Sequence, residues 1–280
     1  MTPLFLTEGI AEIGFGHQDS VTRLTHLYQR DPLRVLFPTP DAGDPALAVI
    51  VTTSGGLVAG DRLDIAVRLA PGAVVHVTAS AAEKIYRSTG PTTTIHQSLA
   101  IAPGAALEFL PPETILFDGA RLRRETVIEL GAGAGFLGGD IVVFGRRARG
   151  ERFTNGFLRE VWQVRREGKL VWGDALHLED DIDGIIDDPA CFGGAAAFAT
   201  LILAPPAQDP RSFLDSARAI QSAGATPTLR AGVTAIAGLV IARWLALDAA
   251  VLRRAYAELA CHLRCEAMGL APRLPRLWHV

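Results

Sequence analysis

The feature that most constrains the fold of this chain is a series of short apolar runs between residues 33 and 203, separated by glycine, proline, aspartate or asparagine. The runs return about every 10–20 residues, and one of them alternates apolar and polar side chains with the period of a β-strand. The clearest runs cover residues 46–51, 63–69, 74–78, 93–101, 125–130, 141–144 and 157–164. The series predicts a mainly β fold, because turn residues between short apolar runs mark the ends of strands.

Helix signals come late in the chain. Residues 210–223 form a helical pattern closed by Gly224, and Asp248 is placed to cap a longer helix that runs to Met268. Residues 272–278 form a proline-rich string that we expect to be extended. The helices should therefore follow the strands rather than alternate with them.

No linker-like segment divides the chain, so we expect a single domain over residues 1–280. Its strand-rich part should cover residues 1–204, with a mixed helix and strand part over residues 205–280 packed on it. Two uncharged runs, 189–208 and 231–242, contain breakers or are short, so neither supplies the roughly 20 apolar residues of a membrane span. Both are predicted to be buried strands.

Composition excludes several classes of protein. Of the 280 residues, 49% are hydrophobic and 20% are charged, which is unlike a disordered chain. The 27 basic and 30 acidic residues leave a net charge of −3, so there is no basic excess to neutralise nucleic-acid phosphates. The low charged fraction suggests that a partner covers part of the surface. Three cysteines suit a reducing cytosol, and the start of the chain lacks a signal-peptide pattern, so we expect a cytoplasmic protein that does not act at a membrane.

One glycine string resembles a nucleotide-binding motif. Residues 133–138 spell G-x-G-x-x-G, the dinucleotide fingerprint, which needs a helix directly after it. Residues 141–144 are typical of a strand instead, so the string favours glycine turns between two strands. A nucleotide-dependent oxidoreductase remains an alternative that rests on this string alone.

Two further segments resemble metal sites. Residues 179–190 begin like a calcium loop but place Ala190 where a bidentate glutamate is needed, so we expect a solvated acidic loop. Cys261, His262 and Cys265 fall in the second predicted helix, where two core thiols are favoured over a metal site. The histidines show no spacing of a metalloenzyme and no nucleophile motif occurs, so no catalytic residue is assigned.

Six strings, taken in order, point to one family. They cover residues 28–35, 54–63, 78–88, 107–117, 145–153 and 274–278. The most specific are G-G-L-V-x-G-D at residues 55–61 and K-x-Y-R at residues 84–87. In this order the strings resemble the UreD family of urease accessory proteins, also called UreH, from about residue 28 to the C-terminus.

The resemblance implies a fold and a function. The fold would be a helically wound β structure, similar to a β-helix or solenoid, with a small number of C-terminal helices. The function would be that of a non-catalytic scaffold, which joins a UreF-like protein and a UreG-like GTPase on apo-urease. This chain would hold Ni²⁺ only transiently, on its way to urease, and would bind no cofactor tightly. GTP would be bound by the GTPase. A solenoid-like ligand-binding module is the alternative, although only 7% of the residues are aromatic.

The resemblance also marks candidate interaction residues. They are Gly55, Gly56, Gly60, Asp61, Lys84, Tyr86, Arg87, Leu277 and Trp278. Asp61 either fixes a turn through its carboxylate or lines a water-filled path for Ni²⁺. Lys84 and Tyr86 should share one strand face, with Arg87 on the other. The apolar tail string has no obvious core role, so we expect it to contact the UreF-like partner.

Where the family usually carries a second glycine pair, this chain has Ala59 and Gly60. Because alanine disfavours positive φ, this turn should not need a positive φ at residue 59.

Overall fold

A computed structural model describes residues 7–279 and is built mainly of β-strands. The strands are β1 (Glu8–Gln18), β2 (Val21–Arg30), β3 (Leu33–Leu36), β4 (Ala46–Thr52), β5 (Arg62–Leu69), β6 (Val74–Ala79), β7 (Glu83–Ile85), β8 (Thr93–Ile101), β9 (Ala106–Phe109), β10 (Thr114–Leu116), β11 (Arg121–Leu130), β12 (Gly135–Phe144), β13 (Phe157–Arg166), β14 (Lys169–Leu178), β15 (Ala197–Ala204), β16 (Leu229–Ile236) and β17 (Leu239–Ala246). The helices are α1 (Ile182–Asp187), α2 (Leu214–Ala223) and α3 (Ala249–Met268), with 3₁₀ turns η1 (Arg147–Arg149), η2 (Pro210–Phe213) and η3 (Arg276–His279).

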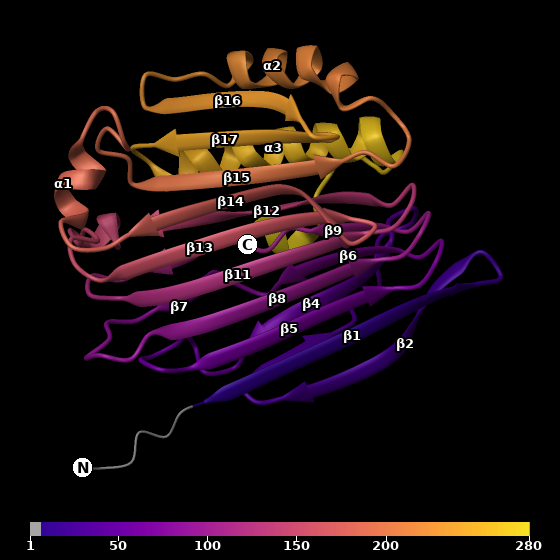
Figure 1. Ribbon diagram of the computed structural model, residues 1–280, viewed down its shortest axis with the longest axis horizontal. Helices are drawn as coiled ribbons and strands as arrows, with labels where there is room; N and C mark the ends of the chain where they lie inside the picture. The colour runs from indigo at the N-terminus through magenta and orange to yellow at the C-terminus, as the bar shows by residue number, and fades with distance from the viewer. Residues whose placement is uncertain (1–6, 280) are drawn as a thin grey trace.

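The strands wind helically between two sheets. The first sheet has the order β14-β13-β11-β8-β5-β1-β2, and the second has the order β16-β17-β15-β12-β9-β6-β4-β3. In chain order β5, β8, β11 and β13 enter the first sheet, while β6, β9 and β12 enter the second between them. Neighbouring strands of this central part pair in parallel, so each coil stacks on the one before, as Figure 1 shows from β1 upward. The solenoid-like prediction is confirmed.

The core between the sheets is a stack of aliphatic rungs. Val67 of β5 lies beside Leu99 of β8, which lies beside Ile128 of β11 and then Val164 of β13. All four side chains are fully buried, because alternate residues of each strand face the opposite sheet. The same alternation in the sequence is what made these strands predictable.

A second core lies on the outer face of the second sheet. Helices α2 and α3 cover β15, β16 and β17 there, and α3 buries Leu252, Tyr256, Leu259 and Leu263 against them. Strand β12 lies between the two cores and is buried at every position. The predicted caps are confirmed: the Asp248 carboxylate accepts hydrogen bonds from the first backbone N–H groups of α3.

Some strand predictions were wrong in detail. The run 231–242 is a hairpin of β16 and β17, which turns at Ala237 and Gly238, both with positive φ. In the run 189–208 only β15 is a strand. Strands β1, β2 and β14 were not singled out; β2 is an exposed edge strand, so it has little apolar alternation to recognise.

The motif-like segments also need correction. Within the acidic segment 179–190, residues 182–187 form the short helix α1, capped by Asp181. In the glycine string only Gly133 lies in a turn, since Gly135 and Gly138 lie in β12. A Cβ at Gly139, the next residue of β12, would overlap the Thr200 carbonyl oxygen, so this glycine allows close strand approach. No helix follows the string, and the oxidoreductase alternative loses its only support.

The remaining corrections concern the C-terminal region. Cys261 is only half-buried and Cys265 is exposed, so they are not the core thiols that we expected, because α3 turns other residues inward. The tail ends in η3 rather than in an extended string, and Leu274 and Trp278 are buried in the second core. Within residues 7–279 no helix has the length and apolar character needed to cross a membrane.

Candidate functional site

Four of the six strings that carry the family resemblance meet in a short ladder attached to the second sheet. There β7 pairs in parallel with β10, and β10 pairs with β12. Leu57 extends this ladder, because its N–H donates to the Lys84 carbonyl (2.7 Å) and its carbonyl accepts from the Tyr86 N–H (2.9 Å). At the other end the Gly145 N–H donates to the Leu116 carbonyl (2.8 Å). Four strings separated in the sequence thus become adjacent rungs.

The outer surface of this ladder carries aromatic and basic side chains. The Tyr86 and Phe117 rings meet edge to face with centroids 4.8 Å apart, and the Arg146 guanidinium lies 4.0 Å from the Phe117 centroid. Arg146 also pairs with Glu151 (2.7 Å). We call Lys84, Tyr86, Arg87, Phe117 and Arg146 the motif face. Tyr86 and Phe117 are half-buried and Lys84 is exposed, so the face is accessible.

Gly56 is required by the ring of Tyr86. A Cβ at residue 56 would lie 2.5 Å from a carbon of that ring, and its φ of 146° is one that L residues rarely adopt. The Tyr86 hydroxyl donates to the Gly55 carbonyl (3.3 Å), so a hydrogen bond joins the string at 55–61 to the string at 84–87. Gly60 takes a positive φ of 84°. Ala59 does not take a positive φ, which confirms the prediction made from the alanine at this position.

Asp61 is buried and bound to the backbone. One carboxylate oxygen accepts from the Val58 N–H (2.9 Å) and the other from the Thr7 N–H (3.3 Å), at 3% exposure. These contacts favour the turn-fixing role. A role toward Ni²⁺ stays a prediction.

Lys84 and Tyr86 flank the buried Ile85, as expected for alternate positions of a strand. Arg87 follows the end of β7 and pairs with Asp118 (3.3 Å), where it is 71% exposed. Arg87 forms an isolated antiparallel bridge with Ala120, and the prediction that its side chain faces away from Lys84 and Tyr86 stays a prediction.

Beneath the ladder lies a buried polar cluster that the sequence analysis missed. Arg124 donates to Glu160 (2.7 Å), to the Thr114 hydroxyl (2.8 Å) and to Asp140. Nearby Glu83 accepts from the Thr52 hydroxyl (2.5 Å). A cavity of about 60 Å³, enough for a few water molecules, touches Thr52, Glu83, Thr114 and Arg124.

Two carboxyl groups of this cluster have raised pKa values. Burial raises the pKa of Asp140 well above its ordinary value, and the adjacent Glu160 raises it further, although Arg124 opposes both. Burial also raises the pKa of Glu83. Burial therefore favours the protonated form of both groups.

A sequence signal for this cluster exists. Leu122, Ile128 and Leu130 mark the inward positions of β11, and Arg124 has the same parity. Glu160 likewise shares parity with buried residues of β13. Charged residues at inward positions of a predicted strand would have identified the cluster. Among residues 7–279 no group of three or more His, Cys, Asp or Glu side chains is placed to hold a metal ion.

Comparisons with known proteins agree over nearly the whole chain. The family model described as UreD urease accessory protein matches residues 7–279. A urease accessory protein UreD of Magnetococcus marinus is 42% identical over 275 residues, which cover 98% of this chain and 94% of the relative. The UreD of Methylobacterium sp. (strain 4-46) is 40% identical over 275 residues, covering 97% and 94%. The UreD 3 of Bradyrhizobium sp. (strain BTAi1) is 40% identical over 263 residues, covering 93% and 89%.

Proposed function

Because the chain belongs to the UreD family of urease accessory proteins, we propose that it is a non-catalytic scaffold for the nickel loading of apo-urease. In this role it joins a UreF-like protein and a UreG-like GTPase on apo-urease in the cytoplasm. GTP is bound and hydrolysed by the GTPase, and Ni²⁺ passes through the assembly as cargo. Family membership carries the proposal, and the convergence of the motif strings on one surface supports it.

The motif face is the proposed docking surface for a protein of this assembly. It combines two half-buried aromatic rings with exposed cationic groups, a composition enriched at protein interfaces. Its geometry is set by backbone pairing of four strings, so it is preorganised. Binding then costs little ordering of the motif face itself.

A second candidate docking surface is apolar, in keeping with the low fraction of charged residues in the chain. The edge strand β2 exposes Val21, Leu24, Leu27 and Tyr28, each between 39% and 48%. An exposed apolar edge strand promotes aggregation unless a partner covers it. We assign this edge to the UreF-like protein in place of the tail, because Trp278 is committed to the core. Leu277 is half-buried and remains a contact candidate.

The polar cluster is the proposed place where Ni²⁺ passes through the coils. Its carboxyl groups can exchange protons for a cation, while Arg124 keeps the site from binding the ion tightly. Weak binding suits an ion that must be handed on. Asp61 immediately precedes β5 and acts on this path only through the turn that it holds.

The direct test is co-expression of apo-urease and its other accessory proteins with and without this chain, followed by measurement of bound nickel and urease activity. Nickel content that does not depend on the chain would end the proposal. Arg87→Ala on the motif face should lower activation about tenfold or more. Arg254→Ala, an exposed arginine of α3, is the matched control and should activate fully.

The cation path has its own test. Asp140→Asn keeps the size of the side chain but removes its ionisable group, so nickel transfer should fall while the complex still assembles. Asp64→Asn, the same change at a partly exposed position, is the control. Equal nickel transfer by Asp140→Asn and Asp64→Asn would refute the path and leave the scaffold role standing.

A further inference from the structure

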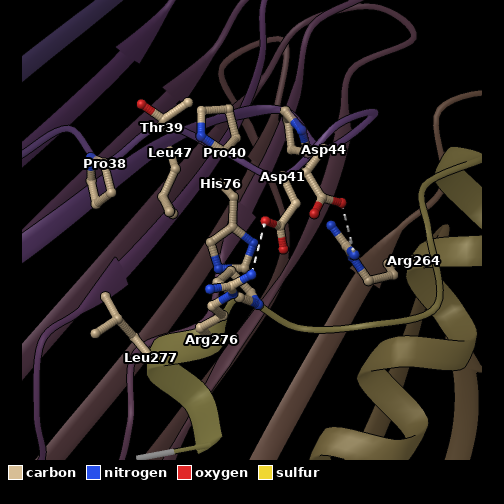
Figure 2. A pocket seen from close by; sticks show the side chains of 12 residues that line it. Pro38, Thr39, Pro40, Asp41, Asp44, Leu47, His76, Arg264, Arg276 and Leu277 are labelled. Atoms are coloured by element: carbon tan, nitrogen blue, oxygen red, sulfur yellow. Dashed lines mark ion pairs between the residues drawn. The ribbon is translucent and has the colours of Figure 1, made fainter.

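A larger cavity lies on the other side of the second sheet, away from the polar cluster. It has a volume of about 300 Å³ and lies between the loop that carries Asp41 and Asp44 and the C-terminal segment that carries Arg276 and Leu277 (Figure 2). It shares no lining residue with the cavity beneath the motif face. A volume of this size admits a small organic group or one long side chain.

A buried histidine faces this cavity with one nitrogen free. His76 is 1% exposed, and its Nδ1 is hydrogen-bonded to Glu108 (2.9 Å). Burial would raise the pKa of Glu108, but the hydrogen bonds from His76 and Arg264, which are the largest opposing causes, hold the pKa at about 2. In the neutral ring, Nδ1–H donates to this carboxylate and Nε2 is an acceptor. Nε2 has no partner among residues 7–279, although it is buried.

Arg264 lines the cavity but has little left to donate. Its Nε and one terminal nitrogen donate to Glu108 (2.7 and 2.9 Å), and the other terminal nitrogen donates to the carbonyls of Ala271 and Arg273. Four of its five N–H groups are thus committed within the fold. Arg264 therefore has few N–H groups left for an anionic ligand. The groups of the cavity that remain free are acceptors.

Asp44 supplies the second free acceptor. Its Oδ2 pairs with Arg273 (3.0 Å), whereas its buried Oδ1 has only a 3.6 Å approach from Arg264 and no hydrogen bond within the described part of the chain. Buried acceptors without donors cost free energy, roughly 1–3 kcal/mol each. A ligand that donates to both would recover that cost.

The other walls of the cavity are apolar, and its mouth carries charged side chains. Pro38, Pro40, Leu47 and Leu277 provide apolar sides for an aliphatic stem. At the mouth Arg276 of the same chain is 90% exposed and lies 3.8 Å from Asp41. A basic side chain thus already lies against the carboxylate at the mouth.

We propose that this cavity binds an aliphatic cation with an ammonium or guanidinium head, whose N–H groups donate to His76 and Asp44. The head enters past Asp41, and the stem lies along the proline and leucine walls. A free alkylamine and a lysine or arginine side chain of another protein present the same chemistry. Arg276 competes for the mouth.

The test is titration of the purified chain with n-butylammonium and n-butylguanidinium by calorimetry, with the His76 ring nitrogens followed by NMR. Saturable binding with a shift of the Nε2 signal is expected, and butyrate of the same length should not bind. A capped five-residue peptide with one central lysine distinguishes the sources: tighter binding than butylammonium supports a protein side chain, and exclusion of the peptide supports a free amine.

Two variants with opposite expectations keep the proposal refutable. Asp44→Asn should lower affinity about tenfold, while the surface control Asp215→Asn should not change it. Arg276→Ala is at an exposed position, so it should fold normally and raise affinity about two- to fivefold by removing the competitor. The proposal is overturned if neither cation saturates the wild-type chain, if butyrate binds equally well, or if Ni²⁺ occupies His76 Nε2 and neither cation competes with it.

Discussion

Removal of the Trp278 side chain should destabilise the whole chain. Trp278 is 4% exposed, stacks on Tyr256 with centroids 5.8 Å apart, and donates from Nε1 to the Leu110 carbonyl (2.8 Å). A buried tryptophan removes about 150–250 Å² from water, or about 4–6 kcal/mol at 25 cal/mol per Å². Measured Trp→Ala losses of about 3–5 kcal/mol overlap this range. We expect Trp278→Ala to lower the free energy of unfolding by about 4–5 kcal/mol.

The assay is urea unfolding of the full chain, followed by circular dichroism. Trp278→Phe keeps most of the apolar area but leaves the Leu110 carbonyl without its donor, so it should lose about 1–2 kcal/mol. Leu277→Ala, at a half-buried neighbour, should lose less than about 1 kcal/mol. A loss below about 1 kcal/mol for Trp278→Ala would refute the core role of the tail. Deletion of the tail is accordingly a poor probe of partner binding, because it opens the second core.

Three further changes test other parts of the fold. Arg124→Met leaves Asp140 and Glu160 buried without their cation and should cost about 3–5 kcal/mol in urea unfolding, whereas the exposed neighbour Arg123→Met should cost little; equal costs would contradict the buried cluster. The Glu108 pKa of about 2, against an ordinary 4.5, corresponds to about 3 kcal/mol of stability that is present above pH 4.5 and lost as the pH falls toward 2. Glu108→Gln should therefore be less stable at pH 7 and lack most of this acid-dependent loss, as urea midpoints between pH 2 and 7 will show; an unchanged acid profile would rule out the depressed pKa. Gly56→Ala should cost about 3 kcal/mol in urea unfolding and displace the Tyr86 ring, while Gly55→Ala, whose methyl meets open space, should cost about 1 kcal/mol; the same cost for both would argue against packing of Tyr86 on residue 56.

Much of the fold was predictable because it is encoded locally. The alternation at residues 63–69 depends only on neighbouring side chains, and β5 forms there. The cap at Asp248 likewise needs only the N–H groups of residues 250 and 251, and α3 begins where the aspartate predicts. Helical winding itself came from the family resemblance and not from these patterns.

The candidate site was less predictable, since its parts are distant in the sequence. The strings around Gly56, Tyr86 and Phe117 were recognised one by one, but nothing in their spacing showed that the Tyr86 ring rests on residue 56 or that Phe117 meets it. The cluster around Arg124 was missed because the predicted run 125–130 begins after Arg124, and because Glu160 in the run 157–164 was not assigned to a face of its strand.

The sequence by itself determined the strand-rich character, the late capped helices and the membership suggested by the motif strings, because periodicity, turns and caps act over a few residues. Only the tertiary structure decided that four strings form one face, that Arg124 lies between coils, and that Trp278 belongs to a core. These outcomes depend on which strands pair and which helix covers the second sheet. Such contacts join residues far apart in the chain, and no local pattern specifies them.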